Sequence, residues 1–479
     1  MMRMYNNVRI WLLILFFQLP LTFIFTQTDA HYWTSQYGSK GLLLNGAVIA
    51  STDDETAVFY NPGALGSKDE LGLSLSFLSP TYAVLKTENY LGQGNVIKDD
   101  GLRFTPGLAA AGFAPFKGNP NIRAALASFT RFSSNIRYRG REVNRFMGSD
   151  DLIFIGNFEF ERRLSERWFG FGMAYRVSDN FSFGATQFLV FHGQNFAFAS
   201  QKEVVYSDQP DQVKMGWRNK VKYSFSANGG MVTKFGLSYR IRDTKIGLTL
   251  TTPTYKSWWG TASYEFDDQK IFSQDSITLS SNLDGASLKN YKTPLSIGLG
   301  LELPIGFRTR LSISAEYFAA VALYTVLEDS DDPLNGLAGQ VNENEVLLNT
   351  GNRAVLNVAL GWQTRINDRS SVIWGFRTDF NQRLLEQDLQ ALQFLSTTPN
   401  IYHISVGNTI VVWNSKFSFG VDFAYGRKTG NTQQVNFQDV TPENLFNLTR
   451  QGSVTSTYSA ILFIVAYDFS YSKKLNKKI

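Results

Sequence analysis

The sequence predicts an all-β fold: a closed, antiparallel transmembrane β-barrel of about 14 strands, preceded by a small N-terminal segment that can plug the lumen. Three observations lead to this prediction. Apolar and polar residues alternate with a period of two almost to the end of the chain. The connections between the alternating runs are sorted into short and long ones. The segment before the first run does not alternate and is rich in glycine.

The composition excludes several functional classes. The chain has 479 residues, no cysteine, 14% aromatic residues and only 18% charged residues. A disulfide framework, a cysteine-ligated metal and a cysteine nucleophile are therefore excluded. The three histidines, His31, His192 and His403, lie far apart and form no metal-hydrolase motif. We expect no enzyme activity, no metal and no cofactor, and a net charge of +5 does not suggest a nucleic-acid partner.

Residues 1–30 have the pattern of a secretory signal peptide. Arg3 and Arg9 give a positive charge before a mostly apolar run over residues 10–24. Ala30 ends a stretch of short residues that suits cleavage. The alternative is a single membrane anchor, but the apolar run is short for one.

Residues 31–69 read as a compact segment before the barrel. Glycines surround short apolar stretches, residues 52–55 could cap a short helix, and Asn61-Pro62-Gly63 signals a turn or a helix stop. About forty residues suffice to fill a lumen, as plugs do in some barrels. The alternative is a periplasmic tail or adaptor.

Residues 70–472 carry the alternating runs and form the predicted barrel. Clear examples are residues 71–77, 295–303, 417–425 and 461–471. Most runs have the 9–11 residues that cross a bilayer with tilt. Closure follows because an open sheet edge in lipid would leave backbone groups unpaired.

The connections alternate between tight polar turns and long segments. Tight turns are expected near residues 117–120, 178–180, 242–244, 304–306, 367–369 and 414–415, and long connections at 80–101, 138–168, 200–229, 253–292, 322–352, 382–399 and 428–455. This rhythm is typical of short periplasmic turns and long outer loops. Both barrel ends then face the periplasm, and residues 473–479 form a short periplasmic tail.

Some side chains have predicted positions relative to the bilayer. Aromatic residues near strand ends suit interfacial girdles: Trp168, Trp362, Trp413 and Tyr471. Charged residues fall on the inward face: Glu316, Arg377, Asp379, Asp422 and Asp468. We expect them to pair within the lumen, as buried charges usually must, rather than to clamp a ligand carboxylate.

Several short motifs resemble one family. Gly46-Ala47, then Asp53-Asp54, Ala57 and Asn61-Pro62, resemble the N-terminal hatch of the FadL-type outer-membrane transporters, whose hatch ends in Asn-Pro-Ala. This chain has Gly63 at the third position of that signature. Residues 175–184, 235–237, 246–248 and 252–253 also resemble the family, so the resemblance covers most of the mature chain.

The resemblance implies a bacterial outer-membrane channel, a monomer, for passive uptake of hydrophobic compounds such as long-chain fatty acids. Substrate would lodge among the outer loops, pass to a pocket above the hatch and leave sideways through the barrel wall. The hatch residues would be Gly46, Ala47, Asp53, Asn61, Pro62 and Gly63. A kink in the third strand (122–138) would open the exit, and Ser133, Ser134 and Asn135 interrupt its alternation; a plain strand end is the alternative.

Three other functions compete with this one: a surface-binding or structural barrel, a general porin, and an outer-membrane hydrolase. The acidic loop at 328–332 would suit a surface partner or cation bridging between lipopolysaccharides, although such charge runs are usually only solvated. No nucleophile motif supports the hydrolase. The partners we expect are a hydrophobic small molecule and outer-membrane lipid, including lipopolysaccharide.

Overall fold

The computed structural model describes residues 30–68, 71–76, 79–105, 107–114, 119–147, 149–258, 260–272, 276–287, 292–327, 348–384, 399–412, 415–433, 435–438, 440–446 and 452–471. Residues 1–29 of the predicted signal peptide, the tail at 473–479, Trp413 and the acidic loop at 328–332 lie outside these ranges.

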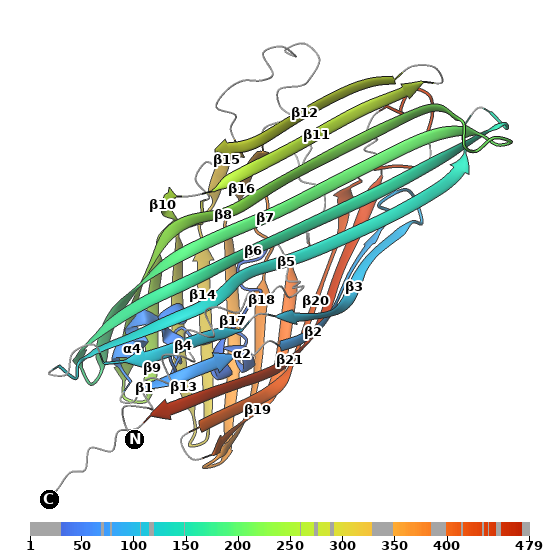
Figure 1. The fold of residues 1–479 in the computed structure, drawn as a ribbon. Coiled ribbons are helices and arrows are strands. Elements are labelled where there is room, and N and C mark those ends of the chain that lie inside the picture. Colours follow the sequence, from blue (N-terminus) through green and yellow to red (C-terminus); the bar gives the residue numbers. More distant parts are fainter. Residues whose placement is uncertain are drawn as a thin grey trace, which may run out of the picture.

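Fourteen strands pair side by side, each antiparallel to the next, and close into a barrel (Figure 1). In ring order they are β1 (Leu71–Ser76), β4 (Leu108–Phe113), β5 (Ile122–Arg145), β6 (Leu152–Ser178), β7 (Phe181–Tyr206), β8 (Val213–Ile241), β9 (Thr244–Thr251), β13 (Ser296–Ile305), β14 (Thr309–Phe318), β17 (Val355–Asn367), β18 (Ser370–Asp379), β19 (Ile401–Val412), β20 (Ser415–Thr432) and β21 (Ser453–Tyr471). The last strand pairs with the first, with Leu71 opposite Tyr471. The predicted strand number and closure are confirmed.

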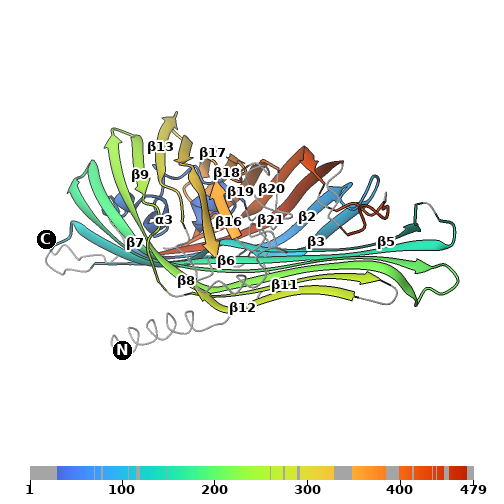
Figure 2. The same ribbon diagram turned by 90° about the horizontal axis from the view of Figure 1, so that it is seen from above.

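Four of the strands are much longer than a bilayer crossing requires. Strands β5, β6, β7 and β8 have 24, 27, 26 and 29 residues. The prediction of long loops at 138–168 and 200–229 is therefore wrong, because the alternation continues through these segments and their backbones pair. Figure 2 shows the resulting curved sheet extending beyond the rest of the barrel.

Shorter strands complete the outer end of the molecule. Strands β2 (Ser79–Glu88) and β3 (Val96–Thr105) form a hairpin that lies between β1 and β4 in the sequence. Strands β10 (Tyr255–Trp258) and β11 (Thr261–Phe272) pair with β8, and β12 (Ser276–Ser287) pairs with β11. A separate hairpin joins β15 (Val321–Leu327) to β16 (Leu348–Asn352).

An apolar belt surrounds the barrel on its outward face. Leu299, Ile404, Phe419 and Phe463 are among its exposed members. The burial alternates along each strand, which places apolar side chains toward lipid and small or polar ones toward the lumen. Trp168 contradicts its predicted girdle position, because only 2% of its surface is exposed and it packs inside the barrel.

The N-terminal segment, residues 30–68, lies inside the barrel. Its three short helices are α2 (Gly38–Leu43), α3 (Ala57–Tyr60) and α4 (Pro62–Gly66), and nearly all of their residues are buried. They pack on wall strands from both halves of the ring, α4 on β6, β7 and β8 and α2 on β19, β20 and β21. Among the described residues, no helix is long and apolar enough to cross a membrane.

Candidate functional site

The Asn61-Pro62-Gly63 turn fastens the N-terminal segment to the wall. The Asn61 side chain caps α4 by accepting a hydrogen bond from the Gly63 amide at 3.0 Å, and Pro62 takes the first helical position. The Asn61 amide donates to the carbonyls of Ile49 and Leu237, at 2.8 and 2.9 Å. Asn61 therefore joins two parts of the segment to strand β8.

Gly63 departs from the Asn-Pro-Ala signature for a steric reason. A Cβ atom at residue 63 would lie 2.7 Å from the carbonyl oxygen of Gly236 in β8. The wall is itself glycine there, and Gly184 in β7 would place a Cβ 2.5 Å from the Pro62 carbonyl oxygen. The inward glycines leave room for the segment, which explains why many lumen positions of the strands are small.

Gly46 and Ala47 turn the chain beneath the opposite wall. Gly46 has a φ of +83°, in the left-handed region that favours glycine, and a Cβ there would also lie 2.7 Å from Gln36 Oε1. Ala47 is buried and lies against Gly361 of β17.

Asp53 lies in an ion-pair network between the segment and the wall. Its carboxylate is 3.5 Å from both the Lys40 and the Lys416 ammonium groups. Lys40 also pairs with Glu302 of β13 at 3.2 Å. The surrounding protein partly desolvates Asp53, which opposes its ionisation, but the neighbouring lysines hold its pKa below the usual range. The Asp53 side chain is 44% exposed, so solvent screens its pairs.

The predicted inward charges bond mainly to the N-terminal segment. Arg377 donates to the Asn45 side chain at 2.6 Å and to the Thr34 carbonyl at 3.0 Å. Asp379 accepts from the Trp33 amide, also at 3.0 Å. Glu316 accepts from the Trp33 indole at 2.8 Å.

Two further predicted charges, Asp422 and Asp468, are buried on the inward face. Asp422 accepts from Asn45 at 3.0 Å and pairs with His403 at 2.9 Å. The contacts of Asp422, with those of Arg377, Asp379 and Glu316, support a structural role for these four charges as anchors of the segment.

A small cavity separates the segment from strands β5, β6, β8, β9, β13 and β14. Its volume is about 30 Å³. Aromatic rings line it from both sides: Tyr32, Trp33, Phe59, Tyr60, Trp168 and Phe318. A cavity of this size holds about one water molecule and is about a tenth of the smallest typical ligand pocket.

Two cations, Arg131 and Lys234, and one carboxylate, Glu316, also line this cavity. The Arg131 guanidinium lies 4.6 Å from the ring centre of Trp168, and the Lys234 ammonium 5.2 Å from that of Phe59. Among the described residues, neither has a carboxylate within 4.0 Å. The sequence analysis missed both. Lys234 carried a signal, because it falls on the inward positions of β8 between Val232 and Gly236.

The third strand contains a bulge next to its predicted kink. The β5–β6 register shifts between Thr130 and Phe132, which makes Arg131 the extra residue. The predicted kink residues Ser133 and Ser134 follow and are buried. The main-chain carbonyl of Asn135 accepts a hydrogen bond from the Arg103 guanidinium. The third strand itself runs to Arg145 rather than ending at Tyr138.

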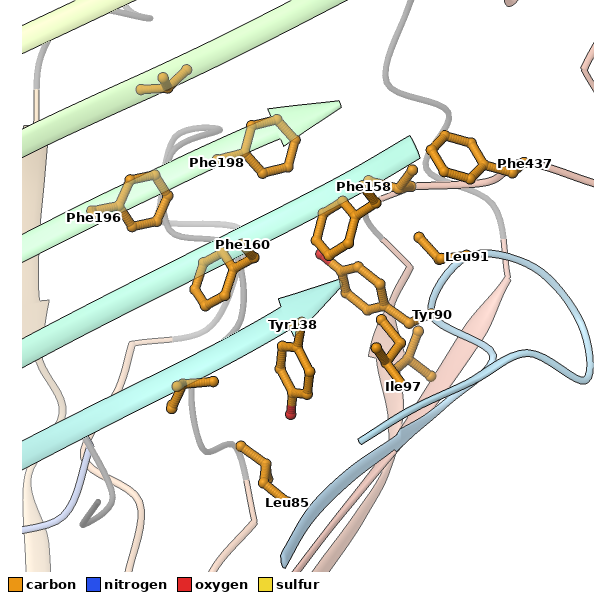
Figure 3. Close-up of a cluster of buried hydrophobic side chains, with 14 of the residues drawn as sticks. Leu85, Tyr90, Leu91, Ile97, Tyr138, Phe158, Phe160, Phe196, Phe198 and Phe437 are labelled. Atoms are coloured by element: carbon orange, nitrogen blue, oxygen red, sulfur yellow. The ribbon is translucent and has the colours of Figure 1, made fainter. Parts of the chain in front are cut away.

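A second aromatic cluster covers the inner face of the long strands. Phe158, Phe160, Phe196 and Phe198 lie on β6 and β7 and face Tyr90, Leu91 and Phe437 from other parts of the chain (Figure 3). The Phe196 ring stacks on Tyr223 with centres 4.6 Å apart. This outer aromatic cluster extends the apolar lining of the barrel outward.

No protein-family model and no curated protein matches this sequence. Solved structures do match its fold. The toluene transporter TodX of Pseudomonas putida superimposes with a TM-score of 0.56 and 14% identity, covering 91% of this chain and 99% of that one. A FadL homologue of Pseudomonas aeruginosa gives 0.57 and 13%, covering 92% and 100%. The monoaromatic hydrocarbon channel CymD gives 0.51 and 13%, covering 91% and 98%.

These superpositions extend over nearly the full length of this chain, and their TM-scores above 0.5 show a common fold. The chain therefore has the β-barrel fold of the FadL-type transporters.

Proposed function

We propose that this protein is a passive, gated channel through which hydrophobic compounds cross the outer membrane, with long-chain fatty acids as its substrate class. The observation that carries the proposal is the cavity beside the N-terminal segment. Aromatic rings there surround two cations that have no carboxylate within 4.0 Å among the described residues, while the carboxylate that also lines the cavity, Glu316, accepts hydrogen bonds from Trp33 and Ser296. Rings suit an acyl chain, and Arg131 and Lys234 suit its carboxylate.

The two cations separate this proposal from transport of neutral hydrocarbons. The similar structures include those of a toluene transporter and of a monoaromatic hydrocarbon channel. A buried cation without a carboxylate partner costs free energy, and an anionic ligand would offset that cost. Fatty acids therefore fit this cavity better than toluene does.

The N-terminal segment acts in this proposal as a hatch. It leaves a cavity of about 30 Å³, whereas ligand pockets typically measure about 300–1,000 Å³. Substrate would first meet the outer aromatic cluster, and the hatch would then shift to enlarge the cavity. The exit would lead sideways between β3 and β5, where the main-chain ladder stops. We propose that one chain suffices and that lipid and lipopolysaccharide surround its apolar belt.

Uptake into liposomes tests the proposal. The purified, refolded protein would be placed in liposomes, and the rates of entry of a fluorescent long-chain fatty acid, the matching fatty alcohol and a charged, water-soluble dye would be compared. We expect saturable fatty-acid entry without dye leak. The double variant Arg131→Gln/Lys234→Met should lose roughly tenfold or more of the fatty-acid rate and keep the alcohol rate, because only the carboxylate interaction is removed. Arg242→Gln, in the β8–β9 turn, is the matched control.

The other outcomes separate the competing functions. Equal loss for acid and alcohol would contradict carboxylate recognition while retaining a hydrophobic channel. Dye leak through the intact protein would indicate a general porin. Absence of any flux through a folded barrel would favour a surface-binding or structural role. Removal of residues 31–69 should admit the dye if the segment is the hatch.

A further inference from the structure

The barrel wall has a seam between β3 and β5. β4 pairs with β5 only as far as Leu108 opposite Phe129. Beyond that point, β3 pairs with β2 and β5 pairs with β6. Within the described residues, the facing edges of β3 and of residues 130–145 of β5 therefore have no main-chain ladder between them. An unpaired edge of this length would normally be unfavourable next to lipid.

Two side chains of β3 bond the open edge of β5. The Arg103 guanidinium donates to the Asn135 carbonyl at 3.0 Å, and the Asp99 carboxylate accepts from the Arg137 amide at 3.2 Å. In a strand, the carbonyl of one residue and the amide two residues later point to the same edge. The two side chains thus occupy groups that a neighbouring strand would otherwise bond.

Asp99 and Arg103 also bind each other. Their ion pair is 2.5 Å long, and the two side chains are only 13% and 10% exposed. Each holds the other in position to reach β5, so the pair forms a single unit rather than two separate surface contacts. Charge-assisted hydrogen bonds of this kind are stronger than neutral ones.

The seam begins at the level of the apolar belt. Leu102 on β3 and Leu126 on β5 flank its lower end and are both exposed on the outward face. Its outer end is closed differently, by a 2.5 Å hydrogen bond from Asn95 to Glu142 and by Leu91 against Gly140. The middle of the seam is held by the Asp99–Arg103 pair and by a 3.3 Å hydrogen bond between the hydroxyl groups of Thr87 on β2 and Tyr138 on β5.

We propose that Asp99 and Arg103 form a latch that holds the seam closed and must release β5 before a hydrophobic solute can leave through the wall. This inference rests on the proposed function, because it assigns the exit to this seam. A ladder would have to separate along its whole length, whereas the latch opens by moving two side chains. The latch residues therefore set the rate of lateral release.

A reversible tether across the seam tests the exit. The chain has no cysteine, so Asp100→Cys and Arg139→Cys introduce a unique pair on the outward faces of β3 and β5. Bridging them with a short, cleavable bis-thiol reagent should lower fatty-acid uptake about tenfold or more, and cleavage should restore it. The control tether joins Arg139→Cys to Glu159→Cys, which are register partners in the β5–β6 ladder, and should leave uptake unchanged.

Spin labels at the same two sites test the latch without any transport. Arg103→Met or Asp99→Asn should lengthen and broaden the distance between labels at residues 100 and 139. The control is Lys86→Met, which removes an exposed ion pair to Glu88 on β2 and should preserve the distance between the same two labels.

The outcomes keep the two proposals apart. If the parent protein transports no fatty acid, the proposed function is wrong, but the distances between the spin labels still test the latch. Normal uptake through the tethered seam would overturn the exit assignment. An unchanged label distance in Arg103→Met and Asp99→Asn would overturn the latch.

Discussion

The Tyr37 hydroxyl donates a hydrogen bond of 2.5 Å to the main-chain carbonyl of Thr130. Thr130 directly precedes the bulge in β5, one residue beyond the last β4–β5 pair, so its carbonyl has lost the ladder that serves its neighbours. Tyr37 belongs to the N-terminal segment and is fully buried. One hydrogen bond thus links the segment in the lumen to the point where the β4–β5 pairing ends.

Tyr37→Phe should uncouple the segment from this part of the wall. The ring would still pack on Phe59 and Phe129, but the Thr130 carbonyl would remain buried without its donor. We expect a loss of about 1–3 kcal/mol in the free energy of unfolding, measured by urea titration. Tyr82→Phe, which removes an exposed hydroxyl bonded to Asp100, should change stability little. Equal effects of the two substitutions would contradict the link.

Gly63→Ala should weaken seating of the segment, although it restores the residue of the family signature. The added Cβ would lie 2.7 Å from the backbone of Gly236, which cannot move aside as a side chain can. Overpacking of this kind costs about 1–3 kcal/mol. Faster proteolysis within residues 30–68 would report it. Ser67→Ala, just after the same helix, is the control, and a Gly63→Ala protein as resistant as the parent would refute the steric reading.

Arg377→Met should detach the segment more strongly than an exposed change does. The substitution removes donors from Asn45 and Thr34 and leaves buried groups without partners. We expect about 3–5 kcal/mol of destabilisation. Arg139→Met removes an ion pair to Glu159 in which the two side chains are 70% and 49% exposed, and should cost about 0–1 kcal/mol. Unfolding titrations of both variants check the difference, and similar losses would argue against Arg377 as an anchor.

Docking of the segment should weaken as the pH rises. Burial, and then repulsion from Asp53, raises the pKa of Asp54 above its usual range. A raised carboxyl pKa in the folded state gives stability that is complete below about pH 4 and is lost as the pH rises through the folded value. Protease resistance of residues 30–68 should therefore fall as the pH is raised above about 4, the ordinary range of an aspartate carboxyl.

Two variants separate the contributions to this pH dependence. Asp54→Asn keeps the side chain neutral and should flatten the fall in protease resistance. Asp53 has the opposite sign, because its lowered pKa gives stability above about pH 4 that is lost at lower pH. Asp53→Asn should therefore reduce resistance at neutral pH. A slope that persists in Asp54→Asn would assign the pH dependence to other groups.

The alternation of side chains by itself determined the strand number and the closure of the barrel. A strand that faces lipid on one side and a packed lumen on the other must alternate apolar with small or polar side chains, as the residues near Leu299 and Phe419 do. A sheet with an open edge would leave backbone groups unpaired in lipid, so such strands indicate a closed barrel. The alternation also continues through residues 138–168 and 200–229, which were predicted to be long loops but belong to the long strands. Asn61, Pro62 and the neighbouring glycines marked a compact segment before the barrel.

Only the tertiary structure decided what the lumen and the wall contain. The bond from Tyr37 to Thr130, the cations Arg131 and Lys234 around one cavity, and the hold of Arg103 on Asn135 each join residues that are separated along the chain or lie on different strands. Alternation assigns a residue to a face but not to a partner across the barrel. Those partners depend on strand register and on how the N-terminal segment settles among the inward glycines, and both are fixed only when the ring closes.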